Sequence, residues 1–238
     1  MNINPDLKIA ALKAEFKEKK LVRIDNFLSI DTAKDAYLFY NNEMPTDWWY
    51  LSTFPLRPGV TQQTDNVREV QDKDLKAINA YKSSLANEYF NEDIYAYSFK
   101  RTIGDHDNTC GCFECKFRGF LDSLEVINTI NEITDYGIIE AGTLFASKYE
   151  KGDFLAPHHD GPNGKIGFVY NLTPGWRPEW GGLLNTLSRD KMTILDSLVP
   201  KYNTLTLFDS STDSGYPHYV THVVRENVKR LSYTGWYR

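Results

Sequence analysis

The sequence predicts an α+β fold in which helices, mainly N-terminal, buttress an antiparallel β-sandwich or barrel. Two observations predict this fold class. Apolar residues recur at helical spacing before residue 137, and after it the chain changes to short β-rich runs separated by Gly, Pro, Asn and Asp. In a sandwich or barrel of seven such runs, the helices must cover the outer face. We expect strands at Thr143–Tyr149, Phe154–His159, Ile166–Leu172, Gly182–Leu187, Asn203–Phe208, His218–Val224 and Leu231–Trp236.

The first 137 residues predict four helices and two strands. Pro5 suits the first position of a helix, and Pro45 ends another, because proline lacks an amide hydrogen and clashes with the preceding turn. Residues 46–71 are irregular and indicate loop, edge-strand or lid material. We expect helices from Pro5 to about Lys20, from Ser29 to about Met44, from Asp74 to about Tyr89 and from Phe120 to before Gly137, with strands at 21–24 and 94–101.

Length and composition favour one ordinary globular domain over residues 1–238. The formal net charge of −5 argues against a nucleic-acid partner, which would need a basic face. No apolar run is long enough to span a membrane, and the polar N-terminus shows no secretory signal. Three cysteines, an odd number, are not typical of a disulfide framework. We therefore expect no membrane partner and a cytoplasmic location.

Three potential metal ligands stand out in the β-rich half. His158 and Asp160 are two residues apart, so on a strand both point to the same face while His159 points away. His218 follows 58 residues after Asp160, and Arg230 follows 12 residues after His218. Two imidazoles and one carboxylate, with further positions open, are the ligand set of non-haem Fe(II) oxygenases. The spacing thus predicts an iron site rather than a closed, cysteine-rich one.

These residues are part of a longer ordered pattern. The sequence resembles the 2-oxoglutarate/Fe(II)-dependent dioxygenases of the prolyl-hydroxylase branch, and most of all the ribosomal-protein prolyl hydroxylases. The resemblance is close over residues 138–238 and looser before them, through Ile24–Leu28. Its motifs are His158–Asp160, the Trp176–Trp180 loop, Gly181-Gly182-Leu183-Leu184, His218-Tyr-Val-Thr-His-Val223 and Arg230-Leu-Ser232-Tyr-Thr-Gly-Trp236.

The resemblance implies a double-stranded β-helix, or jelly roll, formed by residues 138–238, with residues 1–137 as helical support and lid. It implies Fe(II), held by His158, Asp160 and His218, with 2-oxoglutarate and O₂ as co-substrates and ascorbate as an optional addition. The planar fork of Arg230 can bind the far carboxylate of 2-oxoglutarate, and Ser232 lies on the same strand face. Two further residues are expected to contact this co-substrate: Tyr149, and Asn171 in preference to Tyr170.

The implied activity is hydroxylation of an unactivated C–H bond, with release of succinate and CO₂. Asp160 favours hydroxylation, because related halogenases replace this carboxylate with Gly or Ala. By resemblance the substrate is a prolyl residue in a protein or peptide. One alternative is the same chemistry on a free amino acid or other small metabolite. A second is a non-catalytic jelly-roll module that binds or senses a ligand.

Some residues leave alternatives open. His222 lies four residues after His218 and so could share its face, although the family spacing fits only His218. His106, Cys110, Cys112 and Cys115 could bind zinc, but the compressed spacing favours unligated thiols in a capping loop. The aromatic residues of two loops could stack on a substrate, although packing is the commoner role of such residues. They are Trp48, Trp49, Tyr50, Trp176 and Trp180, with Arg177 beside the last two.

Overall fold

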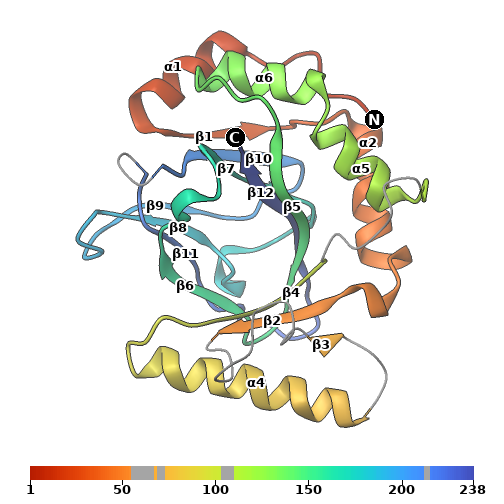
Figure 1. Cartoon of the computed structure of the whole chain (residues 1–238), viewed down its shortest axis with the longest axis vertical. Helices are drawn as coiled ribbons and strands as arrows, with labels where there is room; N and C mark the ends of the chain where they lie inside the picture. Colours follow the sequence, from red (N-terminus) through yellow and green to blue (C-terminus); the bar gives the residue numbers. More distant parts are fainter. Residues whose placement is uncertain (55–66, 69–72, 103–109, 212–214) are drawn as a thin grey trace.

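A curled antiparallel sheet forms the centre of the molecule, and helices cover its outside (Figure 1). The structure is a computed structural model, and it describes residues 1–54, 67–68, 73–102, 110–211 and 215–238. The helices are α1 Ile9–Lys19, α2 Ile30–Leu38, α4 Lys73–Asn91, α5 Phe113–Leu121 and α6 Leu124–Thr134. The strands are β1 Leu21–Asp25, β2 Tyr50–Phe54, β3 Val67–Arg68, β4 Tyr97–Arg101, β5 Ala141–Tyr149, β6 Phe154–His158, β7 Ile166–Asn171, β8 Leu184–Leu187, β9 Ile194–Leu198, β10 Thr204–Asp209, β11 His218–Val220 and β12 Arg230–Tyr237.

The strand order around the sheet is β1-β10-β7-β12-β5-β4-β6-β11-β8-β9, and β2 pairs with β4 and β3. Because the sheet curls, β5, β7 and β12 face β6, β8 and β11 across an interior space (Figure 1). This is the predicted jelly-roll architecture. Each strand therefore has one set of side chains that points inward and one that points toward the helices.

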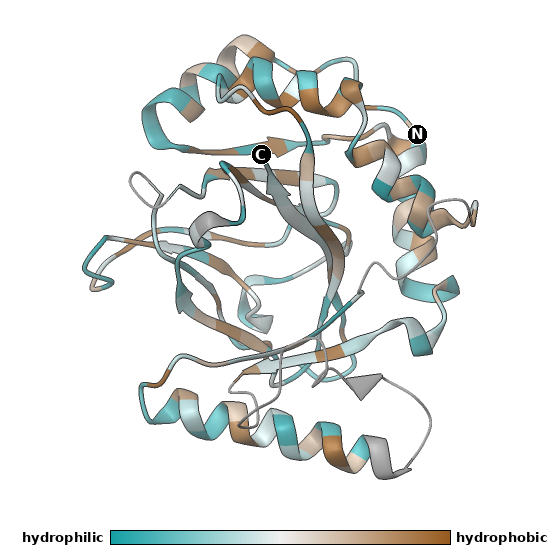
Figure 2. Cartoon of the chain, viewed as in Figure 1, coloured by the Kyte–Doolittle hydropathy of each residue, from teal (hydrophilic) through white to brown (hydrophobic). Residues whose placement is uncertain are grey.

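Two apolar layers follow from this alternation. The outer layer joins α1, α2, α5 and α6 to the backs of the strands, with Tyr170 and Tyr233 among its fully buried side chains. The helices carry apolar residues on one side and polar residues on the other (Figure 2). The inner layer lines the interior and includes Phe99, Tyr149 and Phe208. Among the described residues, no helix is long and apolar enough to cross a membrane.

The structure corrects several expectations. The helix expected to reach Met44 ends as α2 at Leu38 and continues as a π-helical turn, Phe39–Glu43. The helix expected from Phe120 begins at Leu124 as α6, where the Ser123 hydroxyl accepts a hydrogen bond from the Val126 amide and caps the start. Helix α5 precedes it in a segment where a loop was expected. Strand β9 was not expected; it is a mostly exposed partner of β8.

The division at residue 137 does not separate helices from sheet. β1 pairs with β10 along its whole length, and β4 pairs with both β5 and β6. The first half of the chain therefore supplies strands to the same sheet. Much of the expected lid, residues 55–66 and 69–72, lies outside the described residues, as does His106. Trp49 and Tyr50, also considered for a substrate role, are buried.

A buried carboxylate ties the helical layer to the sheet. The Glu114 side chain, on α5, is fully buried and accepts hydrogen bonds from the hydroxyls of Tyr40 and Tyr233, the latter at 3.1 Å. It also forms an ion pair with Arg118, 3.2 Å away. Removing one member of such a group leaves the other polar side chains without partners in a low-dielectric core.

Glu114→Ala should therefore lower the free energy of unfolding by about 2–4 kcal/mol, measured by urea denaturation. Glu226→Ala is the matched control, because Glu226 pairs with Lys151 on the exposed surface and the denaturation midpoint should not move. Equal midpoints for the two variants would show that the buried group contributes no net stability.

Candidate active site

The interior of the sheet contains a cavity of about 280 Å³. Its walls come from both halves of the curled sheet and from β4. Apolar and aromatic side chains form most of the lining, and the polar groups are concentrated at two places. One place holds His158, Asp160 and His218, and the other holds Arg230 with Ser232. A largely apolar cavity with a few convergent polar groups is the usual form of a ligand site.

The pairing of β6 with β11 brings the two histidines together. The strands run antiparallel, and the register places His218 directly opposite His158, with their ring centroids 4.4 Å apart. Each ring has its Nδ1 near a backbone carbonyl: that of Ala156 at 3.0 Å for His158, and that of Tyr216 at 3.4 Å for His218. A proton held on Nδ1 leaves the Nε2 lone pair available to a metal ion.

Asp160 completes the group from the second residue after β6. Its Oδ1 lies 3.4 Å from His158 Nε2 and 3.5 Å from His218 Nε2. The ligand atoms of all three residues lie within 4.8 Å of one another. Gly167 on β7 leaves room for this carboxylate, because a Cβ there would lie 2.5 Å from the Phe208 ring and 3.0 Å from Asp160 Oδ2.

The charges in this group are strongly coupled. Burial alone would raise the pKa of the Asp160 carboxyl, but the His218 imidazole and hydrogen bonds from both histidines lower it well below its ordinary value. Burial lowers the pKa of His218, and the neighbouring Asp160 charge outweighs it, so the net direction is upward. The carboxylate is thus held in its charged form, which is the form a metal ion requires.

Arg230 forms the second polar centre. The side chain starts at the first residue of β12, is only 2% exposed, and donates from Nη1 to the Ser232 hydroxyl at 3.2 Å. The Tyr149 ring lies opposite it in the β5–β12 register, with the guanidinium carbon 5.0 Å from the ring centroid. Burial lowers the pKa of Arg230, and the nearby Tyr149 opposes this shift. Within the described part of the chain no carboxylate pairs with this cation, and its Nε has no hydrogen-bond partner.

Gly182, the second glycine of the pair 181–182, allows Arg230 to reach this position. Both have positive φ angles, +74° and +65°, which favour glycine. A Cβ on Gly182 would lie 2.9 Å from the Arg230 Cδ and 3.2 Å from Val223. Gly182 is therefore a steric requirement of the arginine's position, whereas Gly181 leaves room for the His222 carbonyl.

The structure separates the two residues considered on β7. The Tyr170 side chain is fully buried in the outer layer, and its hydroxyl donates to Asn203 at 2.8 Å. Asn171 has the opposite orientation, on the same strand face as Val169, which lines the cavity. Its register partner is Ser232, and its Oδ1 is buried without a hydrogen-bond partner. Asn171, the residue expected, is thus the one on the cavity side.

His222 and His159 lie apart from the ligand group. The His222 ring stacks on Phe154 at 4.2 Å, and its Nε2 lies 3.1 Å from Asn87 on α4. It therefore faces the helix and not the cavity. His159 is exposed and borders the cavity without joining the other ligand atoms.

The aromatic residues of the 176–180 loop pack against the fold. Trp176 is buried, and its indole N–H donates to the Gly181 carbonyl at 2.9 Å. Trp180 packs edge-on against it, with ring centroids 5.4 Å apart. Arg177 is exposed near Glu179. These residues support the Gly181 turn rather than line the cavity.

Sequence reasoning missed the contribution of β4. Every second residue from Tyr95, just before β4, to its last residue lines the cavity, and Phe99 stacks on Tyr149 at 4.9 Å. Arg101 places a second cation in the cavity, over the Phe145 ring at 5.1 Å, with its Nε unpartnered. Alternating aromatics over residues 94–101 were the available signal. The cavity residues that the sequence did not indicate include Tyr95, Tyr97, Phe99 and Arg101. Ser147 on β5 is another, and its hydroxyl lies 2.8 Å from that of Ser232.

The donor set fits a ferrous ion with a dicarboxylate beside it. Two imidazole nitrogens and one carboxylate oxygen converge, and no thiol is near them to favour zinc. The unpartnered Arg230 Nε and Asn171 Oδ1 are buried polar atoms that a bound polar ligand would satisfy.

Comparisons with known proteins agree with this geometry. Residues 144–238 match the family model of the 2OG-Fe(II) oxygenase superfamily. Over 99 residues the chain is 36% identical to the mouse prolyl 3-hydroxylase OGFOD1. The aligned region makes up 40% of this chain and 18% of the mouse protein. The chain thus matches less than a fifth of that relative's length.

Two solved structures share the fold. A prolyl-4-hydroxylase from Pseudomonas putida superposes with a TM-score of 0.55 and 18% identity, and the match covers 97% of this chain and 98% of the Pseudomonas chain. A Trichoplax adhaerens prolyl hydroxylase, in complex with a hypoxia-inducible-factor peptide, superposes with a TM-score of 0.59 and 17% identity. This match covers 96% of this chain and 88% of the Trichoplax chain. Residues 144–238 are therefore similar to the 2OG-Fe(II) oxygenase superfamily, and the curated relative that matches part of this region is a prolyl hydroxylase.

Proposed function

We propose that the chain is an Fe(II)- and 2-oxoglutarate-dependent dioxygenase that hydroxylates a prolyl residue in a protein or peptide. The observation that supports it most is the convergence of His158, Asp160 and His218 in one cavity with the buried, carboxylate-free Arg230. The His158–Asp160–His218 group alone, or the buried Arg230 alone, could serve only to stabilise the fold. Together they are the two halves of a site for a metal ion and a dicarboxylic acid.

In this proposal the protein's residues bind and orient. His158, Asp160 and His218 would hold Fe(II), which when bound supplies O₂ activation coupled to decarboxylation of 2-oxoglutarate to succinate and CO₂. Arg230 would bind the far carboxylate, with Ser232 fixing the guanidinium and Tyr149 packing against it. Asn171 would offer its unpartnered amide oxygen to the same ligand or to a water molecule.

The prolyl substrate is proposed from the relatives and the cavity wall. The mouse protein is a prolyl 3-hydroxylase, and the Trichoplax protein is bound to a peptide. In this chain the Tyr95 ring lies 6.1 Å from that of His158, and Tyr97 lies beside Tyr95. Aromatic faces next to the metal ligands would pack well against a pyrrolidine ring. We also propose one domain over residues 1–238, ascorbate as an optional reductant and a reducing, cytoplasmic setting.

The test measures succinate release and product mass with prolyl peptides, free proline and other amino acids. Turnover of a peptide with addition of one oxygen atom to proline supports the proposal. Turnover of free amino acids but of no peptide would show that the substrate is a small metabolite. Iron and 2-oxoglutarate binding without any succinate would indicate a binding or sensing module.

Asp160→Ala should abolish succinate release and Fe(II) binding, because it removes the only anionic ligand of the proposed metal group. His222→Ala should retain most of both, since this ring packs against Phe154 and α4. Metal content and turnover are measured on the same preparations. Loss of iron in His222→Ala with retention in Asp160→Ala would refute the ligand assignment.

Gly182→Ala should raise the 2-oxoglutarate concentration needed for half-maximal turnover by about 10-fold or more, because the new Cβ displaces the Arg230 side chain and weakens a charge-assisted bond. Gly175→Ala is the matched control. Its φ of +68° imposes similar backbone strain, but a Cβ there meets no atom within 4 Å. If both variants behave alike, backbone strain and not the arginine explains the effect.

A further inference from the structure

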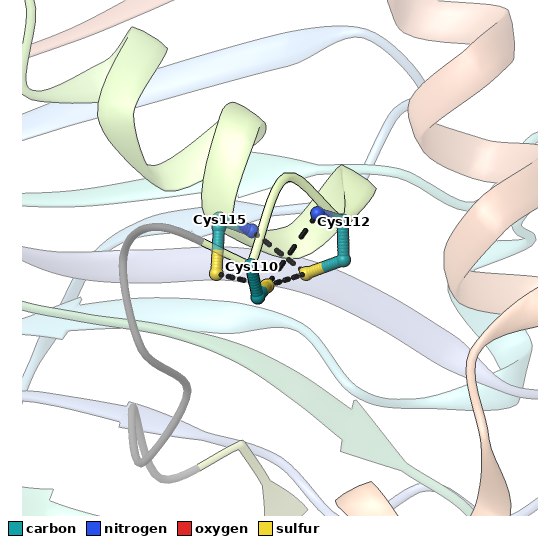
Figure 3. A group of neighbouring side chains, drawn as sticks. All are labelled: Cys110, Cys112 and Cys115. Carbon is teal, nitrogen blue, oxygen red and sulfur yellow. Dashed lines mark hydrogen bonds between the residues drawn. The ribbon is translucent and has the colours of Figure 1, made fainter.

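The chain's three cysteines form a cluster at the start of α5 (Figure 3). The Cys110 Sγ lies 3.0 Å from that of Cys112 and 3.1 Å from that of Cys115. These separations are well beyond a disulfide bond of about 2.05 Å. They are also closer than unbonded sulfur atoms usually approach, so the three side chains converge on one point.

Burial and the neighbouring thiols raise the pKa of the Cys115 thiol to about 12, while backbone amides offer hydrogen bonds to the other two sulfur atoms. The Cys112 amide donates to Cys110 Sγ, and the Cys115 amide donates to Cys112 Sγ, both at 3.4 Å (Figure 3). Cys112 is also the N-cap of α5, a nine-residue helix whose N-terminal end carries partial positive charge. Amide donors and a helix N-terminus stabilise thiolates, but three thiolates at this distance repel one another unless a cation lies between them.

We propose that Cys110, Cys112 and Cys115 bind a zinc ion as thiolates. Soft sulfur ligands select zinc, whereas the imidazole and carboxylate ligands of the cavity suit Fe(II), so the two metals would be sorted by ligand chemistry. Zinc binding displaces the thiol protons into solvent, with up to three released per ion. The three cysteines fill three positions of a tetrahedral site.

The site would have a structural role. Cys115 follows Glu114 directly on α5, and Glu114 bonds to Tyr233 on β12. Tyr233 lies between Ser232 and Thr234 on β12, and both of these residues line the cavity, as does Arg230 at the start of the strand. A zinc ion at the beginning of α5 would thus hold the helix that supports the back of the co-substrate strand.

The chain's cysteine count makes the test specific, because every thiol signal comes from this cluster. Protein purified under reducing conditions is stripped of metal and titrated anaerobically with Zn²⁺ alone, or with Co²⁺ as a spectroscopic probe. We expect one zinc per chain at the cysteines, counted in the Asp160→Asn variant, with protection of all three thiols from a thiol reagent, proton release, and thiolate-to-cobalt charge-transfer absorption. Cys110→Ser and Cys112→Ser should each weaken zinc binding more than about 10-fold, the loss that even an outer partner of a metal ligand causes.

Asp160→Asn controls for metal in the cavity: zinc bound at the cysteines persists in this variant, and zinc bound at the histidines does not. The wild-type cobalt spectrum decides the question even if a cysteine variant fails to fold. Freely reactive thiols at saturating Zn²⁺, with no charge-transfer absorption, would overturn the proposal. So would a disulfide that persists after treatment with reductant, seen as one reactive thiol and a mass lower by two hydrogens.

Discussion

The antiparallel register between β6 and β11 is the constraint on which the site depends. It sets His218 opposite His158, and the chain leaves β6 so that Asp160 turns back toward both rings. Side chains alternate along a strand, so a slip of one residue would turn His218 out of the cavity. The flanking pairs of β6 with β4 and of β11 with β8 fix this register from both sides.

The cavity keeps a buried anion and a buried cation apart. Asp160 contacts two imidazoles, and Arg230 contacts a hydroxyl and a tyrosine ring, so neither neutralises the other. Buried charges are costly unless they are paired, and the fold pays this cost in two separate places. A metal ion bound at Asp160 and a dicarboxylic acid bound at Arg230 would supply the missing opposite charge at each place.

The site could be predicted from sequence where it depends on local spacing. His158 and Asp160 share a motif, and Arg230 and Ser232 share a strand face, so periodicity predicted which side chains lie together, while their roles came from the family resemblance. The role of β4 could not be predicted, because Phe99 and Arg101 reach the cavity only through pairing with β5 and β6, far away in sequence. The α5–α6 break depends on one serine cap, and β9 lacks an apolar period, so neither gave a strong signal. The cysteine spacing alone did not reveal that the three sulfurs converge.

The most direct measurement is an anaerobic crystal structure with Mn²⁺ in place of iron and with 2-oxoglutarate. The account predicts one metal ion bound by His158 Nε2, Asp160 and His218 Nε2, and the far carboxylate of the ligand on Arg230. Arg101 is the informative competitor, because it is the other cavity-lining arginine among the described residues. A metal ion bound away from the histidines, or a carboxylate held by Arg101 instead, would contradict the account.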